Sequence, residues 1–168
     1  MKEVISCSDP IAEPDFELAA MYWRGACMDL FSQSEKLISV CLEHLRDCKH
    51  PLDEESLHPG AAARLRSLLK ALEKSSFSGH ERMARKILQE WQELALHRPY
   101  LAHGIFAVEQ HAAVVHLIEY LKGGRERHPP RRYSKKDMED LLADLEKGVR
   151  RLSSQLAQIR AASVKQAA

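Results

Sequence analysis

The chain has no apolar run near the roughly 20 residues that a membrane-spanning helix requires. Its first residues, MKEVISCSDPIAEPDF, lack the apolar segment that is typical of a secretory signal. The four cysteines include no C-x-x-C pair, which argues against a disulfide framework. These absences predict a cytoplasmic protein without a membrane partner.

The sequence also lacks a glycine-rich phosphate loop and a carboxylate pair of catalytic type. His111 and His116 are five residues apart, so they lie on different faces of a helix or a strand. Such a spacing does not suit a pair of metal ligands. We therefore expect no metal site and no cofactor.

What is present is an ordinary globular composition, with 45% hydrophobic and 29% charged residues in a chain of 168. A chain of this length can bury a core of its own as one domain. Charge is unevenly spread, because residues 1–60 hold five basic and twelve acidic side chains and the remainder is basic. The two halves either neutralise each other, or they favour self-association or a polyanionic partner.

Apolar residues at spacings of three and four predict a long amphipathic helix over about 15–48. Its stripe consists of Phe16, Ala20, Trp23, Cys27, Leu30, Ser34, Leu37, Cys41 and Leu45. Similar patterns predict helices over 61–74, 79–103 and 134–160. Ser78 with Glu81, and Ser134 with Asp137, are typical of helix starts. Pro99 should cause a kink or a local 3₁₀ turn in the third helix, because proline in a helix interior costs ~3 kcal/mol.

The stretch IFAVEQHAAVVHLIEYL is rich in β-branched and aromatic residues, with a reversal at Gln110–His111. It predicts a short β-hairpin over 105–121, with a helical continuation as the alternative. The segment KGGRERHPPRRYS, with its glycines and prolines, is expected to be a loop.

Together these elements predict a mainly α protein, a four-helix bundle with a short β-hairpin insert before the last helix. We divide the chain into an N-terminal extension (1–14), a single helical domain (15–160) and a frayed tail (161–168). The first helix carries two apolar rows, one through Trp23 and Leu30 and one through Phe31 and Ile38. Because one bundle seam needs only one row, the second predicts a homodimer.

One motif has a more specific pattern. In RPYLAHGIF, Arg98 is followed after four residues by His103, then by a glycine, an isoleucine and an aromatic residue. This resembles the R-x(4–6)-H motif of the HEPN family (higher eukaryotes and prokaryotes nucleotide-binding), which in bacterial members often reads R-N-x-L-A-H-G-x-F. The first helix with its tryptophan, Trp91 upstream and the Tyr-Ser start of the last helix fit the same family over about 15–156.

The resemblance implies a helical dimer that binds RNA or a nucleotide, with motifs of two subunits facing each other. It also implies a metal-independent ribonuclease of toxin or defence type, with an antitoxin-like protein partner. Arg98 would hold the scissile phosphate, since a guanidinium matches two phosphate oxygens. His103 would transfer a proton, since an imidazole titrates near neutrality with a pKa of ~6.5.

One position departs from the family pattern, because Pro99 stands where a polar residue is common. Proline donates no hydrogen bond, which favours an alternative: a catalytically silent interaction module of the same fold. In a purely structural role, Arg98 would extend along apolar surface and His103 would bond a carbonyl at a helix end.

A basic segment follows the predicted hairpin, with seven Lys or Arg residues and one Glu between 122 and 136. Basic side chains beside an aromatic ring suit phosphate contact and base stacking. A solvated loop is the alternative. The residues that we predict to bind nucleic acid are Arg125, Arg127, Arg131, Arg132 and Tyr133.

Overall fold

The computed structural model describes residues 14–53, 60–121 and 124–167. Its helices are α1 (Pro14–Asp47), α2 (Ala61–Lys74), α3 (His80–Ala95), α4 (Arg98–His103) and α5 (Lys135–Ala167). Its strands are β1 (Ile105–Glu109), β2 (Ala112–His116), β3 (Ile118–Leu121), β4 (Gly124–Arg127) and β5 (Arg131–Ser134). The protein is thus mostly helical, as the sequence predicts, and small antiparallel sheets lie between α4 and α5 in the chain.

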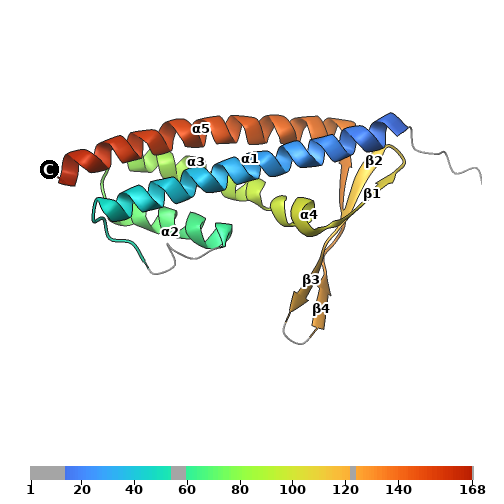
Figure 1. Cartoon of the computed structure of the whole chain (residues 1–168), viewed down its shortest axis with the longest axis horizontal. Coiled ribbons are helices and arrows are strands. Elements are labelled where there is room, and N and C mark those ends of the chain that lie inside the picture. The colour runs from blue at the N-terminus through green and yellow to red at the C-terminus, as the bar shows by residue number, and fades with distance from the viewer. Residues whose placement is uncertain (1–13, 54–59, 122–123, 168) are drawn as a thin grey trace, which may run out of the picture.

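The two longest helices, α1 and α5, lie side by side along the molecule and run in the same direction (Figure 1). Helix α3 packs against α5, and α2 packs against α1 and α3. The strands lie at the end where α1 and α5 begin (Figure 1). Within the described residues, none of the helices combines the length and apolar character needed to cross a bilayer.

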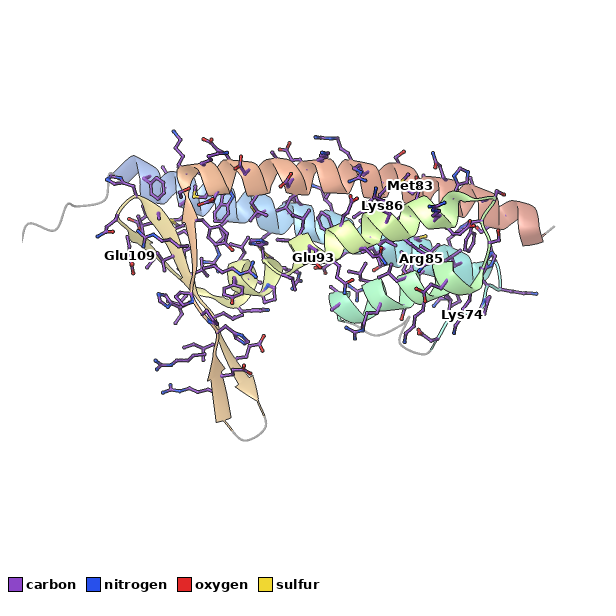
Figure 2. The ribbon with its side chains drawn as sticks, turned by 180° about the vertical axis from the view of Figure 1, so that it is seen from behind. Lys74, Met83, Arg85, Lys86, Glu93 and Glu109 are labelled. Carbon is purple, nitrogen blue, oxygen red and sulfur yellow. The ribbon has the colours of Figure 1, made fainter. Side chains whose placement is uncertain are left out.

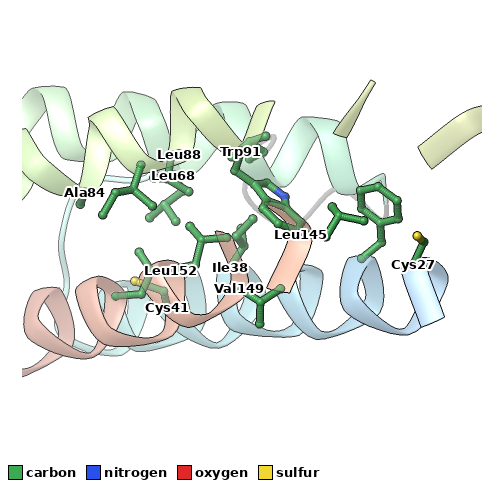
Figure 3. Close-up of a cluster of buried hydrophobic side chains, with 14 of the residues drawn as sticks. Cys27, Ile38, Cys41, Leu68, Ala84, Leu88, Trp91, Leu145, Val149 and Leu152 are labelled. Atoms are coloured by element: carbon green, nitrogen blue, oxygen red, sulfur yellow. The ribbon is translucent and has the colours of Figure 1, made fainter. Parts of the chain in front are cut away.

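The core fills the space between these helices (Figure 3). Trp91 of α3 packs against Phe31 of α1, with 5.9 Å between the ring centroids. Phe31 and Ile38 are only 1% and 3% exposed, and Trp23 is 6% exposed, all within a single chain. Much of both apolar rows on α1 is therefore covered within one chain, so the rows alone do not test the predicted dimer, which stays a prediction.

The predicted helix over 79–103 is interrupted. Helix α3 ends at Ala95, and the N–H groups of Leu96 and His97 bond carbonyls three residues back, as in a tight turn. The chain resumes as α4 with Pro99 in the first turn, where a missing N–H costs little. The expected disruption near Pro99 is confirmed, and of the two expected forms it is the tight turn, at Leu96 and His97, that separates α3 from α4.

The two predicted helix starts differ in outcome. Ser134 and Asp137 bond each other at the start of α5, with the Ser134 hydroxyl 2.6 Å from the carboxylate. Ser78 makes no side-chain cap at α3, where Glu81 accepts a hydrogen bond from the N–H of Phe77 (2.8 Å). The prediction of a frayed tail was also wrong, because α5 continues to Ala167 and buries Ala162 and Ser163. The N-terminal extension lies outside the described residues except for Pro14.

The hairpin prediction is confirmed, and the helical alternative was wrong. β1 and β2 pair from Ile105 opposite His116 to Glu109 opposite Ala112. The two residues between the strands, Gln110 and His111, have φ values of 47° and 57°. Two consecutive left-handed residues are what a tight two-residue hairpin turn requires.

The loop prediction for 122–134 was wrong, because most of this segment is strand. β5 pairs with β2, and β4 pairs with β3. Between the pairs Val115–Arg131 and Ile118–Arg127, one strand has two residues and the other has three. These residues interrupt the pairing, so β3 and β4 form a separate two-stranded sheet. This sheet is an arm that projects from the body (Figures 1 and 2).

Candidate functional site

Helix α4, which carries the R-x(4)-H pattern, is fixed to α1 by Arg24. The Arg24 Nε donates to the carbonyl of Leu101 (2.6 Å), and its terminal nitrogen lies 3.4 Å from the carbonyl of Gly104. The same guanidinium lies over the ring of Phe106, at 5.7 Å. Cationic groups stabilise the last carbonyls of a helix, so Arg24 sets the position of this short element.

Gly104 ends α4, and its place requires a glycine for reasons of space. Its φ of −71° is open to any residue. A Cβ added there would lie 2.3 Å from the side chain of Val115 and 2.4 Å from the carbonyl oxygen of Tyr100. The glycine thus lets the end of α4 pack directly onto β2.

Arg98 forms an ion pair with Glu35 of α1 through its Nε. The second oxygen of Glu35 lies 3.7 Å from a terminal nitrogen of Arg64. The side chains of Arg98 and Glu35 are 33% and 22% exposed, so solvent reaches both. One carboxylate therefore lies between two guanidinium groups.

This cluster borders a pocket of about 430 Å³ between α1, α2, α3 and α4. Phe31, Ile38, Leu65 and Trp91 supply its apolar walls. The charged residues of its lining are Glu35, Arg66 and Arg98. Arg98 is the only residue of the R-x(4)-H pair among the described residues that line it.

His103 lies at the other end of α4 and is exposed. Residues five apart in a helix point about 140° from each other, so His103 and Arg98 lie on different faces. A single chain therefore does not bring the two predicted catalytic residues together. The proposed structural role for His103 also gains no support, since no hydrogen bond of its ring occurs among the described residues.

The predicted nucleic-acid residues divide between the arm and the body. Arg125 and Arg127 are exposed on β4 and alternate with Glu126, so both lie on one face of the arm. Arg131, at the root of the arm, lies 4.5 Å above the ring of Tyr100. The Tyr100 hydroxyl donates to the carbonyl of Pro129 (3.2 Å), which ties the root of the arm to α4.

The remaining two of these residues have structural partners. Arg132 donates to the carbonyl of Glu109 (2.9 Å) and pairs with its carboxylate, which links β5 to β1. Tyr133 is 4% exposed and packs on Trp23, with 5.0 Å between ring centroids. The predicted base stacking by Tyr133 was therefore wrong, because its ring belongs to the core.

His97, just before the motif, was missed by the sequence analysis. Its Nδ1 shares a hydrogen bond of 2.9 Å with the Tyr133 hydroxyl. Burial, together with the charge of Arg131, lowers the pKa of His97 to about 4. The imidazole is therefore neutral near pH 7, and it serves as a hydrogen-bond partner in the packing of α4 against β5.

No family model, no curated protein and no solved structure matches this chain. The candidate site therefore depends on its own geometry. Among the residues that the structure describes, no three His, Cys, Asp or Glu side chains converge as metal ligands.

Glu35 and Arg24 hold α4 from the first helix, and neither is among the site residues predicted from the sequence. A weak signal was available, because Glu35 immediately follows the stripe residue Ser34 and is flanked in helical spacing by Phe31 and Ile38. A charged residue beside two core positions favours a buried partner. The identity of that partner was not accessible from local spacing.

Proposed function

We propose that the protein is a HEPN-like homodimer that binds RNA, and that two copies together form a metal-independent ribonuclease site. The observation that supports this most is the placement of Arg98. Its guanidinium is oriented by Glu35, remains partly exposed and borders a pocket. A phosphate oxygen can approach the exposed side of such a group without first having to order it.

The separation of Arg98 from His103 within one chain supports a site composed of two copies. Large apolar side chains are exposed on one face of α1 and on β1, and the α1 group, which we call the apolar patch, provides a surface for a second copy. Leu18, Met21 and Tyr22 of α1 are 52%, 59% and 72% exposed, and Ile105 of β1 is 64% exposed. Such exposure of large apolar side chains is typical of an interface.

A hydrogen bond of Arg24 links the helix that carries the patch to the end of the motif. Arg24, between the patch residues and the core, bonds the carbonyl of Gly104, which adjoins both His103 and Ile105. Gly25 lies on the same side of α1 as Met21 and Tyr22, and a Cβ added there would meet nothing within 4 Å. Two copies related by a twofold axis through this patch would bring both α4 ends near the axis.

The chemistry requires only groups of the chain and of RNA. A histidine accepts the proton of a ribose 2′-hydroxyl, and the oxygen attacks the adjacent phosphorus. The bond to the 5′-oxygen breaks, and this oxygen takes a proton from the imidazolium that has formed or from water. Arg98 offsets the negative charge that grows on the phosphate oxygens. The products are a 2′,3′-cyclic phosphate and a 5′-hydroxyl.

The arm extends the proposed RNA-binding surface. Arg125 and Arg127 are both exposed on one face of β4, and Arg131 at the root contacts Tyr100 of α4. Backbone phosphates are bound by such basic side chains in a salt-dependent way, without base specificity. We assign Arg125 and Arg127 to phosphate contact.

A second candidate is a catalytically silent interaction module of the same fold. The ion pair of Arg98 with Glu35 supports it, since that pair is also what a purely structural arginine would make. In this case the exposed apolar patch and the arm bind a protein, and no RNA is cleaved.

Cleavage assays on single-stranded RNA in EDTA separate the two candidates. We expect wild-type cleavage, and its loss in Arg98→Ala and in His103→Ala. The matched controls are Arg150→Ala and His116→Ala, which remove exposed residues of α5 and β2 and should cleave like wild type. Wild-type protein that is inert on varied RNAs would contradict the ribonuclease proposal and favour the silent module.

Mixing the two inactive variants tests the composite site. A dimer with one Arg98→Ala copy and one His103→Ala copy keeps one intact pair across the interface. Random exchange of subunits should then restore roughly a quarter of wild-type activity, since half of the dimers are mixed and each has one of two sites. Active wild type without any restoration would show that Arg98 and His103 act within one copy.

A further inference from the structure

The pocket beside Arg98 has an apolar interior and a cationic mouth. Phe31, Ile38, Leu65 and Trp91, which line it, are each at most 5% exposed as residues. Phe31 and Trp91 meet edge to face, so aromatic surface forms part of the interior. The volume of about 430 Å³ falls within the range of about 300–1,000 Å³ that is usual for small-molecule sites.

The mouth of the pocket combines three sources of positive potential. Arg66 of α2 and Arg98 of α4 both line it. Helix α2 begins there, since Gly60, Ala61 and Ala62 line the pocket, and its first turn has no acidic residue. The start of a helix has a partial positive charge, which adds to that of the two guanidinium groups. Among the described residues that line the pocket, Glu35 is the only acidic one.

A ligand that matches this arrangement has a flat apolar body and one anionic group. We propose that the pocket binds a nucleoside monophosphate unit, with the base between the apolar walls and the phosphate at Arg98 and Arg66. The choice of a nucleotide among flat anions rests on the proposed function, in which Arg98 holds an RNA phosphate. The pocket is then the part of the protein that selects the base beside the bound phosphate.

The exposed carboxamide of Gln92 lines the same pocket from α3. A carboxamide offers a donor and an acceptor side by side, and it can pair with the edge of a base. Phosphate contacts alone do not distinguish bases, whereas edge contacts do. Gln92 is therefore the residue that we assign to base discrimination in the pocket.

Isothermal titration calorimetry with AMP, GMP, CMP and UMP tests the pocket, with ribose 5-phosphate and inorganic phosphate as probes that lack a base. We expect at least one of the four nucleotides to bind 10-fold or more tightly than ribose 5-phosphate. Gln92→Ala should reduce the difference among the four nucleotides.

A blocking variant locates the binding. Ala62 is exposed at the mouth, so Ala62→Trp fills the entrance without changing the core. We expect it to weaken nucleotide binding 10-fold or more. Ala143 is an exposed alanine of α5 that does not line the pocket, and Ala143→Trp should bind like wild type. Circular dichroism checks that both variants are folded.

The binding and cleavage experiments can fail independently, so they distinguish the base pocket from the ribonuclease activity. Equal binding of nucleotides and ribose 5-phosphate, absence of nucleotide binding, or unchanged binding by Ala62→Trp would each overturn the base pocket. RNA cleavage that depends on Arg98 and His103 would still stand in those cases. Nucleotide binding that Ala62→Trp abolishes, in a protein that cleaves no RNA, would support the pocket and overturn the ribonuclease proposal.

Discussion

Arg98 at the start of α4 is ion-paired with Glu35 of α1, although 63 residues separate them in the sequence. The pair joins the longest helix on one side of the pocket to the motif-bearing segment on the other. Arg64 approaches the same carboxylate from α2. One acidic side chain thus orients groups from two other helices.

This ion pair predicts that replacing Glu35 and replacing Arg98 lower the unfolding free energy by different amounts. Glu35→Gln removes the charge that faces two guanidinium groups, and it should cost about 2–3 kcal/mol of unfolding free energy, less than for a fully buried pair because solvent reaches the site. Arg98→Ala leaves Glu35 with Arg64 and should cost about 1–2 kcal/mol. Urea unfolding measures both, and the double variant should cost less than their sum.

The exposed pair of Arg150 and Glu146 on α5 provides a control for this cycle. Removing either partner there should change stability by less than about 0.5 kcal/mol, as is usual for exposed pairs of this spacing. Additive costs for Arg98 and Glu35 would show that the two side chains do not interact in solution.

Replacement by alanine should lower the stability of the protein at Gly104 and raise it at Gly25. Gly104→Ala places a methyl group 2.3 Å from Val115 and 2.4 Å from a backbone oxygen, which cannot move aside easily. We expect a loss of about 3 kcal/mol from overpacking. Gly25→Ala meets nothing within 4 Å and should gain about 0.5–1 kcal/mol from helix propensity. A thermal melt of both variants, followed by circular dichroism, checks the signs.

His97 predicts a pH dependence of stability. Its pKa is lowered to about 4 in the folded protein, whereas the unfolded chain titrates near ~6.5. Between these values the unfolded state binds the extra proton, so stability is full above pH ~6.5 and falls as the pH falls toward 4. His97→Gln removes this titration. Between pH ~6.5 and 4, the unfolding free energy of the variant should therefore fall by about 2–3 kcal/mol less than that of wild type.

Urea unfolding at several pH values from 4 to 7 measures the His97 effect. His103→Gln is the matched control, because it replaces an exposed histidine of the same segment with the same side chain. A His97→Gln slope equal to that of wild type would show that other groups cause the acid sensitivity.

The two serines that precede predicted helix starts should differ in importance. Ser134→Ala removes the reciprocal bonds with Asp137 at the start of α5 and should cost about 1 kcal/mol. These bonds also hold the pKa of Asp137 below its usual value, so acid should weaken the same cap. Ser78→Ala removes no cap at α3 and should change stability by less than about 0.5 kcal/mol. Chemical denaturation at neutral pH compares them.

The apolar patch predicts the oligomeric state. Met21→Glu introduces a charge among the exposed apolar side chains of α1, and burying it between two copies would be costly. We expect wild-type protein to be a dimer at micromolar concentration and Met21→Glu to be a monomer, as measured by light scattering. Val164→Glu alters an equally exposed residue near the far end of α5 and should remain dimeric. A monomeric wild type would contradict the proposed assembly.

Local rules were sufficient for much of the fold. Spacings of three and four located α1, α2 and α5, because each helix buries one face. The pair Gln110–His111 between β-branched stretches gave the β1–β2 hairpin. Ser134 with Asp137 gave the start of α5. Each of these features depends on residues within a few positions of one another.

The arm, the burial of Tyr133 and the partner of Arg98 were decided only by the tertiary structure. Glycines and prolines in KGGRERHPPRRYS favour a loop locally, but β2 and β3 supply the ladder partners of β5 and β4. Tyr133 lies among basic residues in sequence, whereas in space Trp23 and His97 enclose its ring. Spacing along a chain determines which face of an element is apolar, but it does not determine which distant side chain meets a given charge, since that depends on how the elements pack.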